Sequence, residues 1–196
     1  MRAVETSNNL AVDTLARVLM PKKGEPHDVR MLYLIEQEQN KQRLRWSDRT
    51  SFEVPAGNEV SFETYFNAFP ASYWRRWSQL DTVVLAMTVQ GRATISVYRS
   101  KYDGTRISVT NVDATGYTEI PLKLGNFEDG GWLWFDITAE EDTRISDAAW
   151  CSPQEPQEQV LDDGTVVPPQ PKQVAVGIPT FNRPRYAVNA LHALAE

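Results

Sequence analysis

Between residues 82 and 149 the sequence repeats short runs rich in Val, Ile, Thr and aromatic residues, the types enriched in strands. Within residues 94–99 apolar side chains alternate with polar ones, as expected where one sheet face packs on a core and the other meets water. A strand needs hydrogen-bonded neighbours, so this pattern constrains the fold most. It predicts an antiparallel β-sandwich or jelly roll with strands at residues 82–89, 93–99, 106–110, 118–124, 132–138 and 143–149.

Glycine-containing turn signals separate these predicted strands, and glycine takes a positive φ at low cost. We expect turns at Gln90-Gly91, Asp103-Gly104, Thr115-Gly116 and Asp129-Gly130-Gly131. Upstream, residues 29–35 are predicted to form another strand. Residues 10–20 fit either a short amphipathic helix ended by Pro21 or an extended arm, and their periodicity does not decide between the two.

Residues 153–173 hold five of the 12 prolines among Gln, Glu and Asp, which is typical of an extended, solvated linker. Residues 162–165, Asp-Asp-Gly-Thr, can turn a small hairpin within it. Beyond it, residues 174–178 are continuously apolar, as in a strand covered on both faces of a parallel sheet, and residues 185–195 have helical spacing. This is one β-turn-α unit, the start of an α/β domain that the chain does not complete.

The sequence thus predicts four parts. We expect an N-terminal arm at residues 1–27, a β-sandwich domain at 28–152, a Pro- and acid-rich linker at 153–173, and the truncated start of an α/β domain at 174–196.

Composition excludes several classes of protein. With 26 acidic against 20 basic residues and a net charge of -6, the chain is a poor candidate for binding nucleic acid. No apolar run approaches the roughly 20 residues that span a bilayer, and the first residues do not read as a secretory signal, so we expect a cytoplasmic protein. Cys151 is the single cysteine, and His27 and His192 lie far apart, which excludes an intramolecular disulfide and a metal site built from cysteines or histidines alone.

Several stretches resemble a known family. Residues 176–184, Val-Gly-Ile-Pro-Thr-Phe-Asn-Arg-Pro, resemble the first strand and nucleotide loop of inverting family 2 glycosyltransferases with the GT-A fold. Residues 24–30, 60–77 and 126–138 are similar to the N-terminal β domain of the polymerising galactofuranosyltransferases of mycobacteria and corynebacteria. The resemblance covers nearly the whole chain.

The resemblance implies an enzyme that transfers galactofuranose from UDP-galactofuranose to a polyprenyl-pyrophosphate-linked glycan. It would build the galactan of cell-wall arabinogalactan as a peripheral protein at the inner face of the plasma membrane. Such an enzyme needs an aspartate cluster holding a divalent cation, Mn or Mg, and a carboxylate base. Neither follows Arg183 here, and Asp162 and Asp163 lie in the linker, where paired acids are usually solvated. We therefore expect no catalytic residue, metal site or cofactor in this chain, and no activity from it alone.

The resemblance also implies a nucleotide-sugar site at the carboxyl end of the strand at 174–178, where open α/β sheets bind ligands. Its candidate residues are Pro179, Thr180, Phe181 and Arg183. The alternative is a plain strand-to-helix turn, capped by Asn182 with Pro184 in the first helical position. Both interpretations can hold together.

An aromatic segment with interleaved arginines and an acidic loop are candidates for contacts with the acceptor glycan. Sugar rings stack on exposed aromatic faces, and charged groups bind their hydroxyls. The alternative is that the aromatic residues pack in the core or at a domain interface, and that the acids belong to a turn. The candidate residues are Tyr73, Trp74, Arg75, Trp77, Glu128 and Asp129.

Three functions fit this sequence. The first is the N-terminal part of the galactofuranosyltransferase. The second is a stand-alone jelly-roll carbohydrate-binding module, against which the β-turn-α unit argues. The third is an architectural domain that packs on the catalytic domain or mediates homo-oligomerisation. The residues do not decide between the first and the third.

Overall fold

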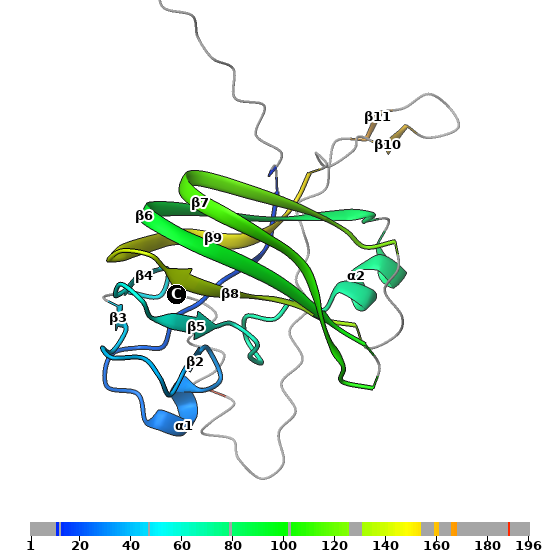
Figure 1. Cartoon of the computed structure of the whole chain (residues 1–196). Helices are drawn as coiled ribbons and strands as arrows, with labels where there is room; N and C mark the ends of the chain where they lie inside the picture. The colour runs from blue at the N-terminus through cyan, green and yellow to red at the C-terminus, as the bar shows by residue number, and fades with distance from the viewer. Residues whose placement is uncertain are drawn as a thin grey trace, which may run out of the picture. The chain divides into compact units, whose positions relative to one another are not determined.

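The computed structural model describes residues 11, 13–46, 48–78, 80–101, 103–125, 131–153, 159–160, 166–167 and 188. The chain divides into two compact units, Met1–Pro156 and Gln157–Glu196. The first unit contains the strands β1 (Asp13–Arg17), β2 (Ile35–Glu36), β3 (Arg45–Trp46), β4 (Ser51–Val54), β5 (Glu59–Ser61), β6 (Thr82–Ser100), β7 (Arg106–Lys123), β8 (Leu133–Ala139) and β9 (Thr143–Ser152), and the helices α1 (His27–Arg30) and α2 (Ala71–Trp77) (Figure 1).

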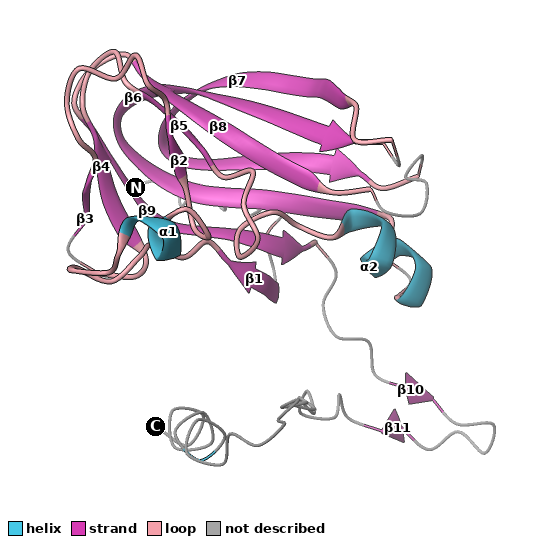
Figure 2. Ribbon diagram, turned by 90° about the horizontal axis from the view of Figure 1, so that it is seen from below, coloured by secondary structure: helices cyan, strands magenta, loops and turns pink. Residues whose placement is uncertain are grey.

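One long antiparallel hairpin, β6–β7, organises the first unit. The opposite edge of β6 is shared: its first half pairs with β9, and its second half pairs with β8. From β8 the sheet continues through β5 to β2, and β9 pairs with β1 and with β4, which leads to β3. The hairpin curves so that the β8 and β9 branches become two layers (Figures 1 and 2).

Aromatic side chains join the two layers. Phe62, just after β5, stacks on Phe135 of β8 with ring centroids 4.7 Å apart, and it also contacts Phe52 of β4 at 5.3 Å. Trp150 of β9 meets Phe135 edge-on at 5.9 Å. Each such fully buried side chain stabilises the fold by about 1.5–3 kcal/mol. The prediction of an antiparallel β-sandwich is confirmed.

Two predicted turns, at Gln90-Gly91 and Thr115-Gly116, are wrong, because β6 and β7 continue through them without reversing direction. Gly91 lies inside β6, between Val89, which pairs with Gly116 of β7, and Ala93, which pairs with Ala114, and the register shifts there. Both glycines have positive φ, 116° and 69°, and a Cβ on Gly91 would stand 2.7 Å from Oγ1 of Thr143. Glycine here permits a bend and a close approach to β9 rather than a reversal. The turn predicted at Asp103-Gly104 is confirmed, since it connects β6 to β7.

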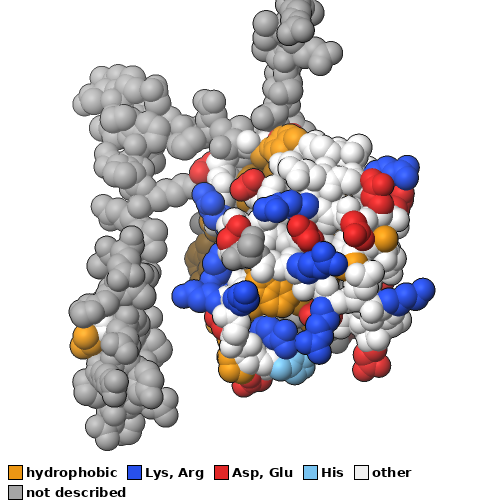
Figure 3. All heavy atoms as spheres, turned by 90° about the vertical axis from the view of Figure 1, so that its left-hand side faces the viewer, with side chains coloured by type: hydrophobic (Ala, Val, Ile, Leu, Met, Phe, Trp, Pro, Cys, Tyr) orange, Lys and Arg blue, Asp and Glu red, His pale blue; other side chains and the backbone are white. Residues whose placement is uncertain are grey.

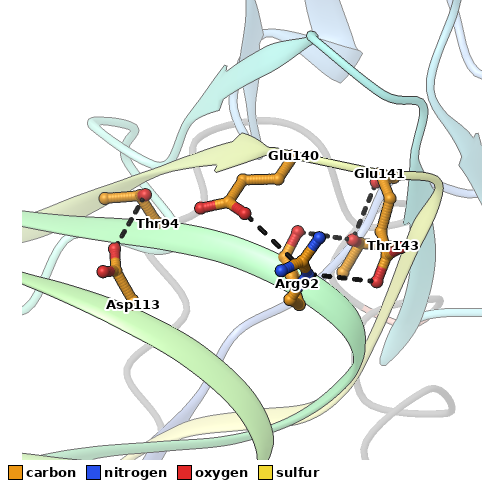
Figure 4. Close-up of polar contacts among 6 residues, drawn as sticks. All are labelled: Arg92, Thr94, Asp113, Glu140, Glu141 and Thr143. Carbon is orange, nitrogen blue, oxygen red and sulfur yellow. Dashed lines mark hydrogen bonds and ion pairs between the residues drawn. The ribbon is translucent and has the colours of Figure 1, made fainter.

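Polar contacts hold this bend (Figure 4). The Thr143 hydroxyl lies 3.0 Å from the carbonyl oxygen of Arg92 and 2.8 Å from that of Glu141. The Arg92 guanidinium lies 3.9 Å from the Glu140 carboxylate and 3.8 Å from that of Glu141. These contacts tie β6 to the β8–β9 turn where β6 changes partner.

The strand predicted at residues 29–35 is also wrong. Residues 27–30 form α1, whose first hydrogen bond runs from the Arg30 amide to the Pro26 carbonyl. Residues 31–33 form a turn after α1, and Leu34 is buried behind it. Only Ile35 and Glu36 join the sheet. For residues 10–20 the extended alternative is correct: β1 pairs with β9, so the sheet begins before residue 28.

The second unit is described only in part. β10 (Gln159–Val160) pairs antiparallel with β11 (Val166–Val167), as a small hairpin around residues 162–165 predicts. The turn itself and the predicted β-turn-α unit at 174–196 lie outside the described residues, apart from the helical Val188. In the described part of the chain, no helix is long and apolar enough to cross a membrane.

Candidate functional site

The helix α2 presents two large aromatic side chains outward. Tyr73 and Trp77 lie one helical turn apart, with 66% and 69% of their surfaces exposed and ring centroids 6.4 Å apart. The guanidinium of Arg76 lies 5.3 Å from the Trp77 ring, within cation–π range. Arg75 is exposed on the same helix. We call Tyr73 and Trp77 the α2 aromatic pair.

Trp74, on the same helix, packs inward instead. Its ring stacks on that of the buried Phe69, with centroids 5.8 Å apart and planes 16° apart, and Phe69 in turn stacks on Trp150. For Trp74 the structure therefore shows the packing alternative. α2 was not predicted from the sequence, since a seven-residue helix offers too short a period to recognise.

Backbone hydrogen bonds fix α2 beside the start of β8. Phe69 and Leu133 exchange two of them, at 2.7 and 2.9 Å, and the Ser72 amide donates to the Gly131 carbonyl at 3.1 Å. Trp132, which follows Gly131, is 41% exposed. These hydrogen bonds attach the helix that carries the α2 aromatic pair to the start of β8.

A second group of side chains lies on the outer face of β8. Its core-facing residues alternate with Trp134 and Asp136, which are nevertheless only 2% exposed each. Arg106 of β7 reaches across β6 and donates a hydrogen bond to Asp136. On the way its guanidinium lies 3.6 Å from the centre of the Tyr98 ring, and it stands 3.7 Å from the Glu63 carboxylate. We call Glu63, Tyr98, Arg106, Trp134 and Asp136 the Arg106 cluster.

Two members of the Arg106 cluster, Arg106 and Glu63, have a raised pKa. Burial opposes the charge of Arg106, but the hydrogen bond and the negative charge of Asp136 outweigh it and raise the pKa of the guanidinium. Burial raises the pKa of Glu63, the charge of Arg106 lowers it, and the charge of Asp136 adds to the rise. In this cluster one cation, Arg106, contacts two carboxyl groups, those of Glu63 and Asp136.

Sequence reasoning missed this cluster. Asp136 is the single charged residue in the apolar run of residues 132–138, and that position was the available signal. Its partner Arg106 is 30 residues away in the sequence, so their contact had no local pattern.

The structure does not describe the remaining candidate site residues. Pro179, Thr180, Phe181, Arg183, Glu128 and Asp129 lie outside the described residues. Within the described residues, no three His, Cys, Asp or Glu side chains come together as a metal site would require. On the face drawn in Figure 3, Lys and Arg side chains lie among Asp and Glu side chains around a small apolar patch.

Relatives of known name match this chain over most of its length. Galactofuranosyltransferase GlfT2 of Mycolicibacterium smegmatis is 48% identical over 99% of this chain and 29% of its own length. The protein of the same name from Mycobacterium tuberculosis is 45% identical over 95% of this chain and 28% of its own. The chain thus spans less than a third of these relatives.

Two solved structures are also similar. TmCBM61 in complex with β-1,4-galactotriose matches with a TM-score of 0.33 and 15% identity, over 61% of this chain and 86% of its own. A mutant of a carbohydrate binding module of family 29 matches with a TM-score of 0.37 and 10% identity, over 69% of this chain and 89% of its own.

The family described as galactofuranosyltransferase 2 N-terminal matches residues 15–153, which run from within β1 to just past β9. This match covers the sandwich described above, including both α2 and the Arg106 cluster. The chain belongs to the galactofuranosyltransferase 2 N-terminal family.

Proposed function

We propose that this chain is the N-terminal β domain of a galactofuranosyltransferase and that it holds the acceptor glycan for a catalytic domain packed on it. The whole protein transfers galactofuranose from UDP-galactofuranose to a polyprenyl-pyrophosphate-linked glycan in cell-wall galactan synthesis. Membership of the family and the resemblance of residues 176–184 to a nucleotide loop support this proposal. The lipid on the acceptor supports a peripheral place at the inner face of the plasma membrane.

The observation that carries the acceptor role is the exposure of the α2 aromatic pair. Tyr73 and Trp77 are each about two-thirds exposed, although large aromatic side chains are usually well buried. The apolar C–H faces of sugars pack against such rings, while hydroxyls reach polar groups at the rim. Because Trp74 and the Gly131 contact immobilise α2, little conformational freedom is lost when a glycan binds.

The donor site is a separate part of this proposal. UDP-galactofuranose lies against Pro179, Thr180, Phe181 and Arg183, with Arg183 offering charge-assisted hydrogen bonds to a phosphate or the uracil edge. We assign the divalent cation, Mn or Mg, and the catalytic base to the whole protein rather than to this chain, which spans 29% of the length of its relative. Glu128 and Asp129, which precede Gly131, remain candidate acceptor contacts.

A titration tests the acceptor role. The 196-residue chain is titrated with a synthetic galactofuranose oligosaccharide by calorimetry, beside variants Tyr73→Ala and Trp77→Ala. Each variant should weaken binding by about two- to tenfold, the value of a lost aromatic contact. Tyr117→Ala, which removes an exposed tyrosine on β7, is the matched control and should bind as the parent does. Absence of binding by the parent, or equal affinity of all four proteins, would contradict the proposal.

A further inference from the structure

Two buried polar atoms on β8 have no hydrogen-bond partner. In the described part of the chain three buried side-chain atoms are in this position: Nε of Arg30, Nε1 of Trp134 and Oδ1 of Asp136. The last two lie two residues apart on the same face of one strand, and they are a donor and an acceptor. Leaving a buried polar group unpaired costs about 1–3 kcal/mol, so such a pair calls for a specific explanation.

The surroundings of this pair are polar and aromatic. The neighbours of Asp136 across the sheet are Ser61 on β5 and Ser96 on β6, and the neighbour of Trp134 is Tyr98. Their rings stack with centroids 6.0 Å apart. A row of small hydroxyl side chains therefore adjoins an aromatic row, the two chemistries that a sugar ring offers on its edge and its face.

The charge of the site selects the class of ligand. Arg106 is the one cation of the cluster, and it is already engaged by the carboxylates of Asp136 and Glu63. An added phosphate or carboxylate would meet two negative groups and no unengaged cation within the cluster. A neutral polyhydroxyl compound instead accepts a hydrogen bond from the Trp134 N–H with one hydroxyl and donates to Asp136 with another.

Arg106 closes this site. Asp136 is 2% exposed, whereas the Arg106 side chain is 42% exposed and lies over the Tyr98 ring at 3.6 Å. Just beyond Tyr98 the register of β6 and β7 shifts, so that Val109 is the extra residue of a β-bulge. Bulges re-aim nearby side chains, and this one lies between Arg106 and the regular part of the hairpin.

We propose that Trp134 and Asp136 form a subsite for one residue of a neutral glycan, with Arg106 as its movable cover. When the sugar enters, the guanidinium leaves the Tyr98 ring and the sugar takes its place there. The subsite rests on the proposed function in taking a glycan as its ligand, but it uses a surface other than α2.

Indole N–H resonances test the subsite directly. The 196-residue chain has six tryptophans, and its Trp134 and Trp77 resonances are assigned by their loss in Trp134→Phe and Trp77→Phe. Titration with methyl β-galactofuranoside should shift the Trp134 resonance saturably, whereas UDP at the same concentrations should not. The shift should persist in Tyr73→Ala, which alters only the α2 aromatic pair.

Two variants of the subsite test how much each polar atom contributes to the affinity for the furanoside. Trp134→Phe keeps a ring and loses the donor, and Asp136→Asn keeps the shape and loses the charge. Each should weaken binding of the furanoside by about tenfold, as expected for one hydrogen bond. Asp113→Asn changes another acid on the outer face, which pairs with Thr94, and should leave the affinity unchanged. If Asp136→Asn unfolds, Trp134→Phe decides.

The outcomes separate the two proposals. A Trp77 resonance that moves while that of Trp134 stays still overturns the subsite and leaves the acceptor role of the domain standing. If neither resonance moves, the subsite is overturned, and the oligosaccharide titration of the α2 variants decides the acceptor role. A shift of the Trp134 resonance by UDP overturns the assignment to a neutral ligand. Magnetisation transfer from a bound water to the Trp134 N–H, unchanged by the furanoside, shows that water satisfies the pair and overturns the subsite.

Discussion

Arg106 and Asp136 meet across an intervening strand: the arginine leaves β7, passes over the Tyr98 ring on β6 and donates a hydrogen bond to the aspartate on β8. The Asp136 side chain is only 3% exposed, so the guanidinium supplies the charge that makes its burial tolerable. The contact links three strands on the outer face of one layer.

Removing the cation should therefore destabilise the sandwich. Arg106→Met leaves the buried carboxylate of Asp136 without its partner, and we expect the free energy of unfolding to fall by about 1.5–3 kcal/mol in urea titrations. The double variant Arg106→Met/Asp136→Asn should recover part of this loss. Arg45→Met, which breaks an exposed ion pair with Glu53, is the control and should cost less than about 1 kcal/mol. Equal losses of unfolding free energy in Arg106→Met and Arg45→Met would show that the contact with Asp136 contributes no more than a surface ion pair.

The bend of β6 predicts a difference between two glycines. Gly91→Ala places a Cβ 2.7 Å from Oγ1 of Thr143 at a φ of 116°, so both a clash and backbone strain arise. We expect a loss of about 2–4 kcal/mol in unfolding free energy. Gly57→Ala at a φ of 74° meets no atom within 4 Å and should lose only about 1 kcal/mol. Thermal unfolding of both variants gives the comparison, and a Gly91→Ala protein no less stable than Gly57→Ala would contradict the close approach.

The two tryptophans of α2 should separate stability from binding. Trp74→Ala removes a half-buried ring stacked on Phe69 and should cost about 2–3 kcal/mol of unfolding free energy, below the loss for a fully buried ring. Trp77→Ala removes an exposed ring and should change stability by less than about 0.5 kcal/mol while weakening glycan binding. Chemical denaturation and calorimetry on both variants check the pair, and the reverse pattern would exchange their roles.

Tyr117 should make the sandwich sensitive to alkaline pH. Burial, the hydrogen bond that its hydroxyl donates to Glu119 and the negative charge of that carboxylate raise its pKa from 10.0 to about 12. Between these values the unfolded chain has lost the phenol proton and the folded chain has kept it, so stability falls as pH rises through this window. Tyr117→Phe should show a smaller fall. Tyrosinate absorbance followed with pH should show one late-titrating group that is missing in the variant.

The nucleotide loop is testable in a longer protein that contains it. If the loop after the strand at 174–178 cradles the donor, Arg183→Ala should weaken UDP-donor binding by about ten- to a hundredfold, with folding nearly unchanged. Asn182→Ala should instead cost about 1 kcal/mol of stability with little effect on donor affinity, as expected for a helix cap. Titration calorimetry at matched salt decides, and equal donor affinity with and without Arg183 would leave only a strand-to-helix connection.

Local patterns in the sequence determined the β class and several elements. The strands predicted at 132–138 and 143–149 correspond to β8 and β9, because enrichment in β-branched and aromatic residues is a property of the segment itself. The turn at Asp103-Gly104 was predicted from its own residues, because glycine takes a positive φ at low cost. The family could also be recognised from the sequence, since long stretches of unusual composition carried the resemblance.

The tertiary structure decided what local patterns leave open. A glycine with positive φ suits a reversal or a bend equally well, and only the proximity of Thr143 to Gly91 selects the bend. Likewise, Trp74 and Trp77 are the same residue type on one helix, and the position of Phe69 determines which of them is buried. The contact between Arg106 and Asp136 depends on the pairing of β7, β6 and β8, because side chains 30 residues apart meet only when a sheet brings their strands together.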